Sequence, residues 1–290
     1  MHTEKILKEI KDLSTEIDEL TRKRESLIDT LTVNNGLDNG VKNVTWEYGS
    51  WIWEYGSWED VTNMLNVHYA GLIDITKYWK TGDTRRIQLS TGESLELVLI
   101  GNNHDDLVKP INGVSKAAFT VQTKICEISE MFTDYKGPQY SLWSESLIRE
   151  YLNNKFKSSL PSALQSLIKR VKKETFRHGF KGDVGEFYRT AIVTQDDIFL
   201  LSETEVFGAQ NLGPDCGYGA DGIQYTYYKN PYNRIHYYPE NKHVFIDPSW
   251  WLRSSNVNHK GESSFRIVSN GSVGGIMASN VNRLAPAFCI

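Results

Sequence analysis

The first 31 residues carry a heptad pattern, in which apolar side chains recur at alternating spacings of four and three residues. Arg24 interrupts the series once, and Lys and Glu fill many of the positions between. An isolated helix cannot bury so narrow an apolar stripe, so it packs against copies of itself or against a partner. The pattern therefore predicts a coiled-coil helix over residues 1–33 that forms a homo-oligomer, a dimer or a trimer, through Ile6, Ile10, Leu13, Ile17, Leu20, Leu27 and Leu31.

Composition and charge exclude several classes of protein. A formal net charge of −4 provides no basic field for a polyanion, so we expect no nucleic-acid partner. No stretch reaches the length of about 18 apolar residues that membrane insertion needs, and no apolar signal segment opens the chain. The three cysteines, Cys126, Cys216 and Cys289, are too far apart in sequence to indicate a disulfide framework or a zinc site. We therefore expect synthesis in a reducing cytoplasm and no cofactor or metal.

Turn-forming residues separate the predicted coiled coil from the rest of the chain. Asn34-Asn35-Gly36 ends the helix, and a second Asn-Gly pair continues the linker. The five residues Trp-Glu-Tyr-Gly-Ser then occur twice, starting at Trp46 and at Trp53, and a period of seven is too short for a solenoid repeat. We assign residues 34–56 to a linker whose repeat packs at the domain entrance as an edge strand or loop. Ser57, with Asp60 three residues on, predicts the N-cap of a helix that opens a domain over residues 57–290.

The domain combines strand and helix patterns, which predicts an α+β fold. Alternating apolar residues on both sides of Thr91-Gly92 indicate a hairpin, and residues 119–125 indicate a third strand. Helical spacing predicts one helix over residues 144–156, with Leu147, Ile148, Tyr151 and Leu152 inward, and a second from Pro161 to Val171. Residues 223–228 and 265–268 read as strands, and Asn270-Gly271 is typical of a hairpin turn. The apolar residues 286–290 predict a buried terminal strand.

Several segments of the domain together resemble a known family. They are residues 100–106 (IGNNHDD), 200–208 (LLSETEVFG), 250–254 (WWLRS), 270–273 (NGSV) and 285–288 (APAF). Their order and spacing resemble a family of uncharacterised domains from Gram-positive bacteria and their phages, several of which sit on tail or fibre proteins. That family is similar to the C-type-lectin-like and formylglycine-generating-enzyme folds. The resemblance implies a C-type-lectin-like domain over residues 57–290.

The resemblance also implies a binding region. Phage tropism determinants of this fold carry receptor contacts between the Trp-rich strand and the closing strand, which here spans residues 255–283. The implied ligand-binding residues are Asn256, Asn258, His259, Asn280 and Asn282. Aromatic faces can pack on sugar CH groups. We therefore add Trp251, as the member of the tryptophan pair that faces a groove, and Tyr237 from the tyrosine-rich residues 225–238.

No group of residues has the spacing of a catalytic site. His104-Asp105-Asp106 places a histidine beside two carboxylates, but neighbouring residues on a strand point to opposite faces, so we interpret it as a structural turn. Cys126 and Cys289 lie in apolar, strand-like runs, which leaves Cys216 as the single candidate for a reactive thiol. We therefore predict that the protein is not an enzyme.

These expectations together favour a phage tail or tail-fibre tip protein. Such a protein would be made in the host cytoplasm, join other tail proteins in the virion and bind a bacterial surface glycan or protein receptor. Two alternatives stay open. The chain could be a structural baseplate or tail component without receptor binding, or an enzyme acting on cell-wall polymer. The enzyme would need converging carboxylates, which no spacing in the sequence indicates.

Overall fold

The computed structural model describes residues 46–124, 129–132, 142–181, 186–208, 221–235, 249–257, 263–269 and 271–290, with positions 12, 13, 15, 16, 19, 20, 22 and 23. Those eight N-terminal positions are all helical. Leu13 and Leu20, one heptad apart on the predicted seam, are 53% and 59% exposed. The other seam residues, Ile6, Ile10, Ile17, Leu27 and Leu31, lie outside the described residues, so the coiled coil stays a prediction.

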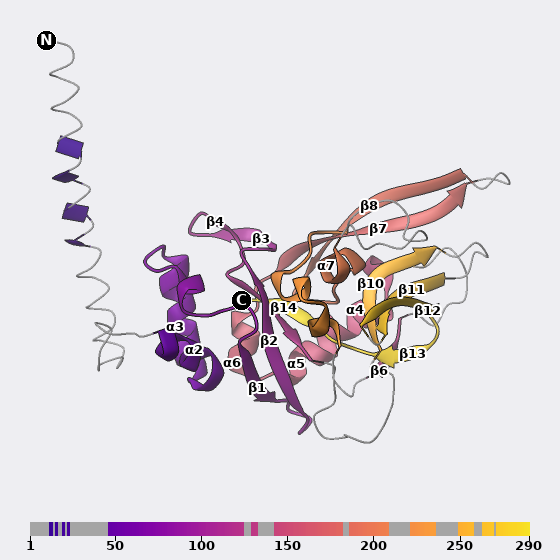
Figure 1. Cartoon of the computed structure of the whole chain (residues 1–290), viewed down its shortest axis with the longest axis horizontal. Helices are drawn as coiled ribbons and strands as arrows, with labels where there is room; N and C mark the ends of the chain where they lie inside the picture. Colours follow the sequence, from indigo (N-terminus) through magenta and orange to yellow (C-terminus); the bar gives the residue numbers. More distant parts are fainter. Residues whose placement is uncertain are drawn as a thin grey trace, which may run out of the picture.

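The described chain has an α+β fold with short helices and three sheets (Figure 1). The α-helices are α2 (Trp46–Tyr55), α3 (Trp58–Tyr69), α4 (Leu147–Tyr151), α5 (Lys157–Ser159), α6 (Ser162–Leu167) and α7 (Glu203–Phe207). A π-helix, η4 (Leu152–Phe156), joins α4 to α5. The 3-10 helices are η2 (Ile75–Lys77), η3 (Trp143–Glu145), η6 (Thr226–Lys229) and η7 (Pro231–Arg234).

Each sheet combines strands that are distant in sequence. The first has the order β1 (Thr84–Gln88), β2 (Ser94–Asn102), β5 (Phe119–Thr123), β14 (Ala287–Cys289), β9 (Ile198–Phe199). The second has the order β12 (Ser272–Met277), β11 (Ser263–Ser269), β10 (Trp250–Val257), β13 (Val281–Arg283), β6 (Ser129–Met131). The third has the order β4 (Val114–Lys116), β3 (Asp106–Ile111), β7 (Val171–Lys181), β8 (Glu186–Asp196). Among the described strand pairs, β10 and β13 are the parallel one.

The Trp-Glu-Tyr-Gly-Ser repeat is helical, so the prediction of an edge strand or loop is wrong. Its first copy lies in α2, and its second copy spans the end of α2 and the N-cap of α3. Seven residues are about two turns of an α-helix, so a period of seven returns the same residue types to one helix face. Ile52 and Trp53 are buried in the main core, which confirms the packing role. Arg85 donates to the carbonyls of Trp53 (2.7 Å) and Gly56 (2.8 Å) and thereby satisfies the end of α2.

The local signals at both ends of the domain are confirmed. Ser57 and Asp60 form a reciprocal capping box at the start of α3. Gly92 has a φ of +91° in the β1–β2 turn, a conformation that glycine adopts without strain. The terminal strand β14 lies between β5 and β9, and residues 287–290 are fully buried. Figure 1 accordingly shows the C-terminus close to β2 and β14 rather than at the edge of the molecule.

The middle of the chain departs from prediction in three places. The second helix ends at Leu167, and Val171 instead begins the long hairpin of β7 and β8. Lys173 and Thr175 occupy buried positions of β7, so this strand lacks the alternation of apolar and polar residues that would reveal it in the sequence. Tyr225 and Tyr228 are buried three residues apart around the helix η6, which replaces the strand predicted over residues 223–228. Leu147 is 42% exposed because the inward face of α4 is formed by other residues, among them Ile148.

Candidate functional site

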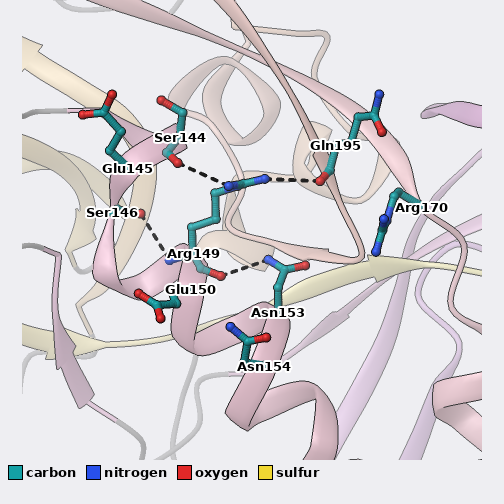
Figure 2. Close-up of a pocket in the computed structure, with 9 residues that line it drawn as sticks. All are labelled: Ser144, Glu145, Ser146, Arg149, Glu150, Asn153, Asn154, Arg170 and Gln195. Atoms are coloured by element: carbon teal, nitrogen blue, oxygen red, sulfur yellow. Dashed lines mark hydrogen bonds between the residues drawn. The ribbon is translucent and has the colours of Figure 1, made fainter.

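A polar pocket of about 420 Å³ opens where α4 and the π-helix η4 approach the end of β8 (Figure 2). Charged and amide side chains dominate its wall, and none of its described lining residues is aromatic. The lining residues are Ser144, Glu145, Ser146, Arg149, Glu150, Asn153, Asn154, Arg170 and Gln195. These residues belong to η3, α4, η4 and β8 or to the short connections beside described elements.

Asn153 holds the π-helix against the strand that follows β8. Its amide nitrogen donates to the carbonyls of Arg149 (3.0 Å) and Ile198 (2.8 Å). Its amide oxygen accepts from the backbone N–H groups of Asp197 (3.0 Å) and Ile198 (3.1 Å). The side chain is fully used in positioning the backbone, and short π-helices occur frequently at functional sites. Asn154 is thereby placed, exposed, on the pocket wall.

Arg149 lines the pocket and is held by several partners. Its Nε donates to Asp196 Oδ1 at 2.6 Å, and its terminal nitrogens donate to the carbonyls of Ser144 (3.2 Å) and Gln195 (3.3 Å). Figure 2 shows this guanidinium reaching between those two residues. The second oxygen of Asp196 accepts from the Trp143 indole at 3.0 Å. The carboxylate therefore has partners on both oxygens, and Arg149 is pre-ordered.

Other side chains in the pocket are open to a ligand. Within the described part of the chain, the side chains of Glu145, Glu150, Asn154 and Gln195 make no hydrogen bond. Figure 2 shows the two glutamates on one side of the pocket and Arg170 on the other. The pocket can thus accept hydrogen bonds on one side, donate them on the other and do both through the amides.

Asp197 anchors Arg170 beside this pocket. It accepts from Arg170 at 2.7 and 2.9 Å and from Lys157 at 2.7 Å. The hydrogen bond from Arg170, together with Lys157 and against a smaller effect of burial, lowers the pKa of Asp197 from 3.8 to about 2. The folded state therefore favours the ionised carboxylate.

The Asp197 ion pair should make part of the stability depend on pH. Because its pKa is lowered on folding, the contribution is present above about pH 4 and is lost as the pH falls towards 2. Because the Arg170 side chain is 58% exposed, solvent screens this pair, and we expect its contribution to the free energy of unfolding to be about 1 kcal/mol. In urea titrations at pH 5 and pH 2, Asp197→Asn should lack this change. Asp106→Asn, at an exposed ion pair with Lys116, should keep it. Equal pH dependence in all three proteins would contradict the assignment.

A second cluster of charges is completely buried, and it joins three of the family-like segments. Lys173 Nζ lies 2.5 Å from Asp105 Oδ1 and 3.0 Å from Glu205 Oε1. Arg253 contacts both oxygens of Glu205, at 2.5 and 2.9 Å. Residues 105, 173, 205 and 253 are each at most 5% exposed. Strand β10 thus supplies Arg253 and strand β7 supplies Lys173. The two carboxylates come from α7 (Glu205) and from the turn before β3 (Asp105).

The charges in this cluster stabilise one another against the cost of burial. Burial acts to raise the pKa of the Asp105 carboxyl, but the Lys173 ammonium and His104 hold that pKa well below its ordinary value. Burial likewise acts to raise the pKa of Glu205, and Arg253 and Lys173 lower it. Removing one member would leave an unpaired charge in the core. In this arrangement the segments stabilise the fold, and their charged groups are not open to a ligand.

The structure confirms a turn at His104-Asp105-Asp106. Asn103 adopts a φ of +45°, so the chain turns and is not extended as a strand here. His104 stacks on Tyr225 with ring centroids 3.9 Å apart, and its Nδ1 lies 3.5 Å from Asp105 Oδ1. Asp106 is instead paired with Lys116 at the surface. His104 therefore approaches Asp105, its neighbour in sequence, and not Asp106.

The predicted ligand-binding residues are scattered. Trp251 is fully buried and donates its indole N–H to the carbonyl of Glu130 at 2.9 Å, so the prediction that it faces a groove is wrong. Asn282 is 8% exposed, and its Oδ1 accepts from Ser249 at 3.0 Å. Asn280 lies in an exposed turn before β13. The backbone of Asn256 pairs with Ser264 in the second sheet.

The rest of that set, Asn258, His259 and Tyr237, lies outside the described residues, as do Cys126 and Cys216. A ligand-binding role for residues 255–283 therefore stays a prediction. The polar pocket was not predicted at all. Its only signals in the sequence are the polar positions of the expected helix over residues 144–156 and the adjacent pair Asp196-Asp197.

Clusters of metal-ligating side chains and membrane-spanning helices were both sought in the described part of the chain. Its His, Cys, Asp and Glu side chains form no group of three or more that could hold a metal ion. None of the helices in the ranges given above is long and apolar enough to cross a membrane.

Comparisons with known proteins identify a family over the part of the chain that holds the pocket. No curated protein and no solved structure matches the chain. A family model described as "Domain of unknown function (DUF6273)" matches residues 121–290, which is more than half of the chain. This range includes every residue that lines the polar pocket, and also Lys173, Glu205 and Arg253 of the buried cluster. The chain therefore belongs to the DUF6273 family.

Proposed function

We propose that this protein is a non-enzymatic attachment protein of a phage tail or tail-fibre tip, and that it binds a bacterial surface glycan through the polar pocket. The resemblance of the family-like segments to domains of tail and fibre proteins motivates the place in the virion. A C-type-lectin-like fold for residues 57–290 belongs to the same proposal. The pocket is the single observation on which glycan binding rests.

The chemistry of the pocket suits a polyhydroxylated ligand. Each sugar hydroxyl can donate and accept, and the pocket offers glutamate acceptors, arginine donors and amides that do both. Because Arg149 and Asn153 are held by several hydrogen bonds each, the wall is ordered before a ligand arrives. Since none of the described lining residues is aromatic, hydrogen bonds and bridging water, and not stacking, would carry the affinity.

Oligomerisation through residues 1–33 would strengthen such binding. Leu13 and Leu20 are helical and exposed in the single chain, as the residues of a coiled-coil seam are before assembly. A dimer or trimer would present several pockets to one surface. Linked sites can exceed the affinity of one site by about 10²–10⁴-fold. Weak binding at each pocket would then suffice for attachment.

Binding of the full-length protein to isolated Gram-positive cell-wall glycan tests the proposal. The double variant Asn154→Ala/Gln195→Ala removes two open amides and should bind at least about five-fold more weakly, since each lost hydrogen bond costs about 0.5–1.5 kcal/mol. The matched control Lys155→Ala/Val193→Ala changes exposed residues of the same two elements outside the pocket wall. It should bind like the unchanged protein.

Other outcomes would redirect the proposal. Unchanged binding by the double variant would contradict the pocket, and loss of binding in Asn280→Ala would place the contact in residues 255–283. Release of new reducing ends from the glycan would contradict a non-enzymatic role. Absence of binding by the unchanged protein would favour a structural virion component.

A further inference from the structure

Lys173 is the one buried lysine in the described part of the chain, at 2% exposure. Lysine is almost never fully buried without a specific reason. The ring of Phe199 lies 3.9 Å from its Nζ, and the Tyr225 hydroxyl lies 2.9 Å away. The amine is therefore enclosed by aromatic and carboxylate groups and shielded from bulk solvent.

Asp105 faces this amine with both oxygens already engaged. Oδ1 contacts Lys173 Nζ at 2.5 Å. Oδ2 accepts hydrogen bonds from the hydroxyls of Tyr225, at 2.8 Å, and of Thr120. Donors on Oδ2 are placed where negative charge would develop if a nucleophile added to the carboxyl carbon. The third group is Glu205, whose Oε1 lies 3.0 Å from Nζ and can accept a proton from it.

We propose that Lys173 and Asp105 join in an intramolecular isopeptide bond. In this reaction the ammonium first passes one proton to Oδ1, and the neutral Nζ adds to the Asp105 carboxyl carbon. The Tyr225 and Thr120 hydroxyls stabilise the charge on Oδ2. Glu205 takes a second proton from the nitrogen and returns it to the departing Oδ1 hydroxyl.

The step is balanced without any other reactant. The ammonium and the carboxylate become one amide and one water molecule: the C–Oδ1 bond breaks and the C–Nζ bond forms. No oxidant, metal or cofactor takes part. The net charge of the chain is unchanged, because one positive and one negative charge disappear together.

Burial provides the driving force for condensation. Two ions held out of water carry a large desolvation cost, which a neutral amide does not. The water molecule that is formed leaves when the core opens locally, and hydrolysis would need another water molecule to enter among side chains that are at most 5% exposed. After condensation Glu205 remains paired with Arg253, so the rest of the cluster stays neutralised.

The bond would connect two parts of the fold covalently. Asp105 lies in the turn between β2 and β3, and Lys173 lies on β7, 68 residues away. A cross-link there ties the first sheet to the β7–β8 hairpin. It would make the domain resistant to denaturants, whether or not the protein binds a glycan.

The intact mass of the full-length protein, measured after denaturation, tests this inference. We expect a mass below that of the sequence by one water molecule, and a protease digest in which the peptides containing Asp105 and Lys173 stay joined. Lys173→Met, which has no amine, should show the full mass. Lys109→Met, which removes an exposed amine on β3, should keep the loss of water.

Two results would overturn the inference. One is the full sequence mass in folded, unchanged protein, which needs no variant to be stable. The other is a loss of water confined to the peptide containing Asp105, as a succinimide formed with Asp106 would give. An Asp105→Asn variant adds a positive check, because the same amide would then form with loss of ammonia in place of water.

Discussion

Replacing Arg253 with Met is expected to lower the free energy of unfolding by about 3–5 kcal/mol, because it removes one partner of a buried ion pair. Glu205 would lose both hydrogen bonds from the guanidinium while remaining at 2% exposure. The carbonyls of Leu200 and Asp221 would lose the same donor. Urea unfolding followed by circular dichroism measures the loss, and the variant should retain little cooperative transition if the domain is only marginally stable.

The matched control is Arg170→Met. This arginine also pairs with a carboxylate, Asp197, but its side chain is 58% exposed. Ion pairs at the surface contribute about 1 kcal/mol or less, so the control should unfold close to the unchanged protein. An equal decrease in the free energy of unfolding in both variants would contradict the larger contribution expected from the buried Arg253 pair.

Shortening the chain at its C-terminus should have the second large effect. Deletion of residues 287–290 is expected to abolish folding, because β14 pairs with β5 on one side and β9 on the other. Phe288→Ala alone should cost about 3–5 kcal/mol, as for other fully buried aromatic side chains. The deletion variant should lack cooperative unfolding by circular dichroism, and the Phe288 variant should unfold at lower urea.

Val193→Ala is the control for the Phe288 substitution. Val193 also lies on a strand, β8, but is 60% exposed. Its replacement should change the free energy of unfolding by no more than about 0.5 kcal/mol. A cooperative, native-like transition in the deletion variant would contradict a central place for β14.

Local signals in the sequence were sufficient where neighbouring residues decide the structure. The Ser57–Asp60 capping box, the turn at Gly92 and the apolar terminal strand were all predicted, because caps, turns and strand patterns act over a few residues. The same reasoning failed for β7. There a lysine takes an inward position, and a pattern of polarity cannot reveal a charge that is neutralised by distant groups.

Distance along the chain also explains the errors at the tryptophans and at the tandem repeat. Because neighbouring residues on a strand point to opposite faces, one tryptophan of the pair was expected to face a groove. Both faces of β10 are covered at this point, and Trp250 and Trp251 are both fully buried. The repeat starting at Trp46 fits either a strand or a helix. In the structure the repeat is helical, and the ring of Trp53 packs on the ring of Trp79 with their centroids 5.6 Å apart.

By itself, the sequence determined the α+β class, the local caps and turns, and the strands at the two ends of the domain. Only the tertiary structure decided what the buried charges do. Asp105, Lys173, Glu205 and Arg253 are far apart in sequence and lie on different elements, as are the two sides of the polar pocket at Asn154 and Gln195. Their partners depend on the path of the whole chain, because electrostatic pairing in a core is set by distance in space and not by spacing in sequence.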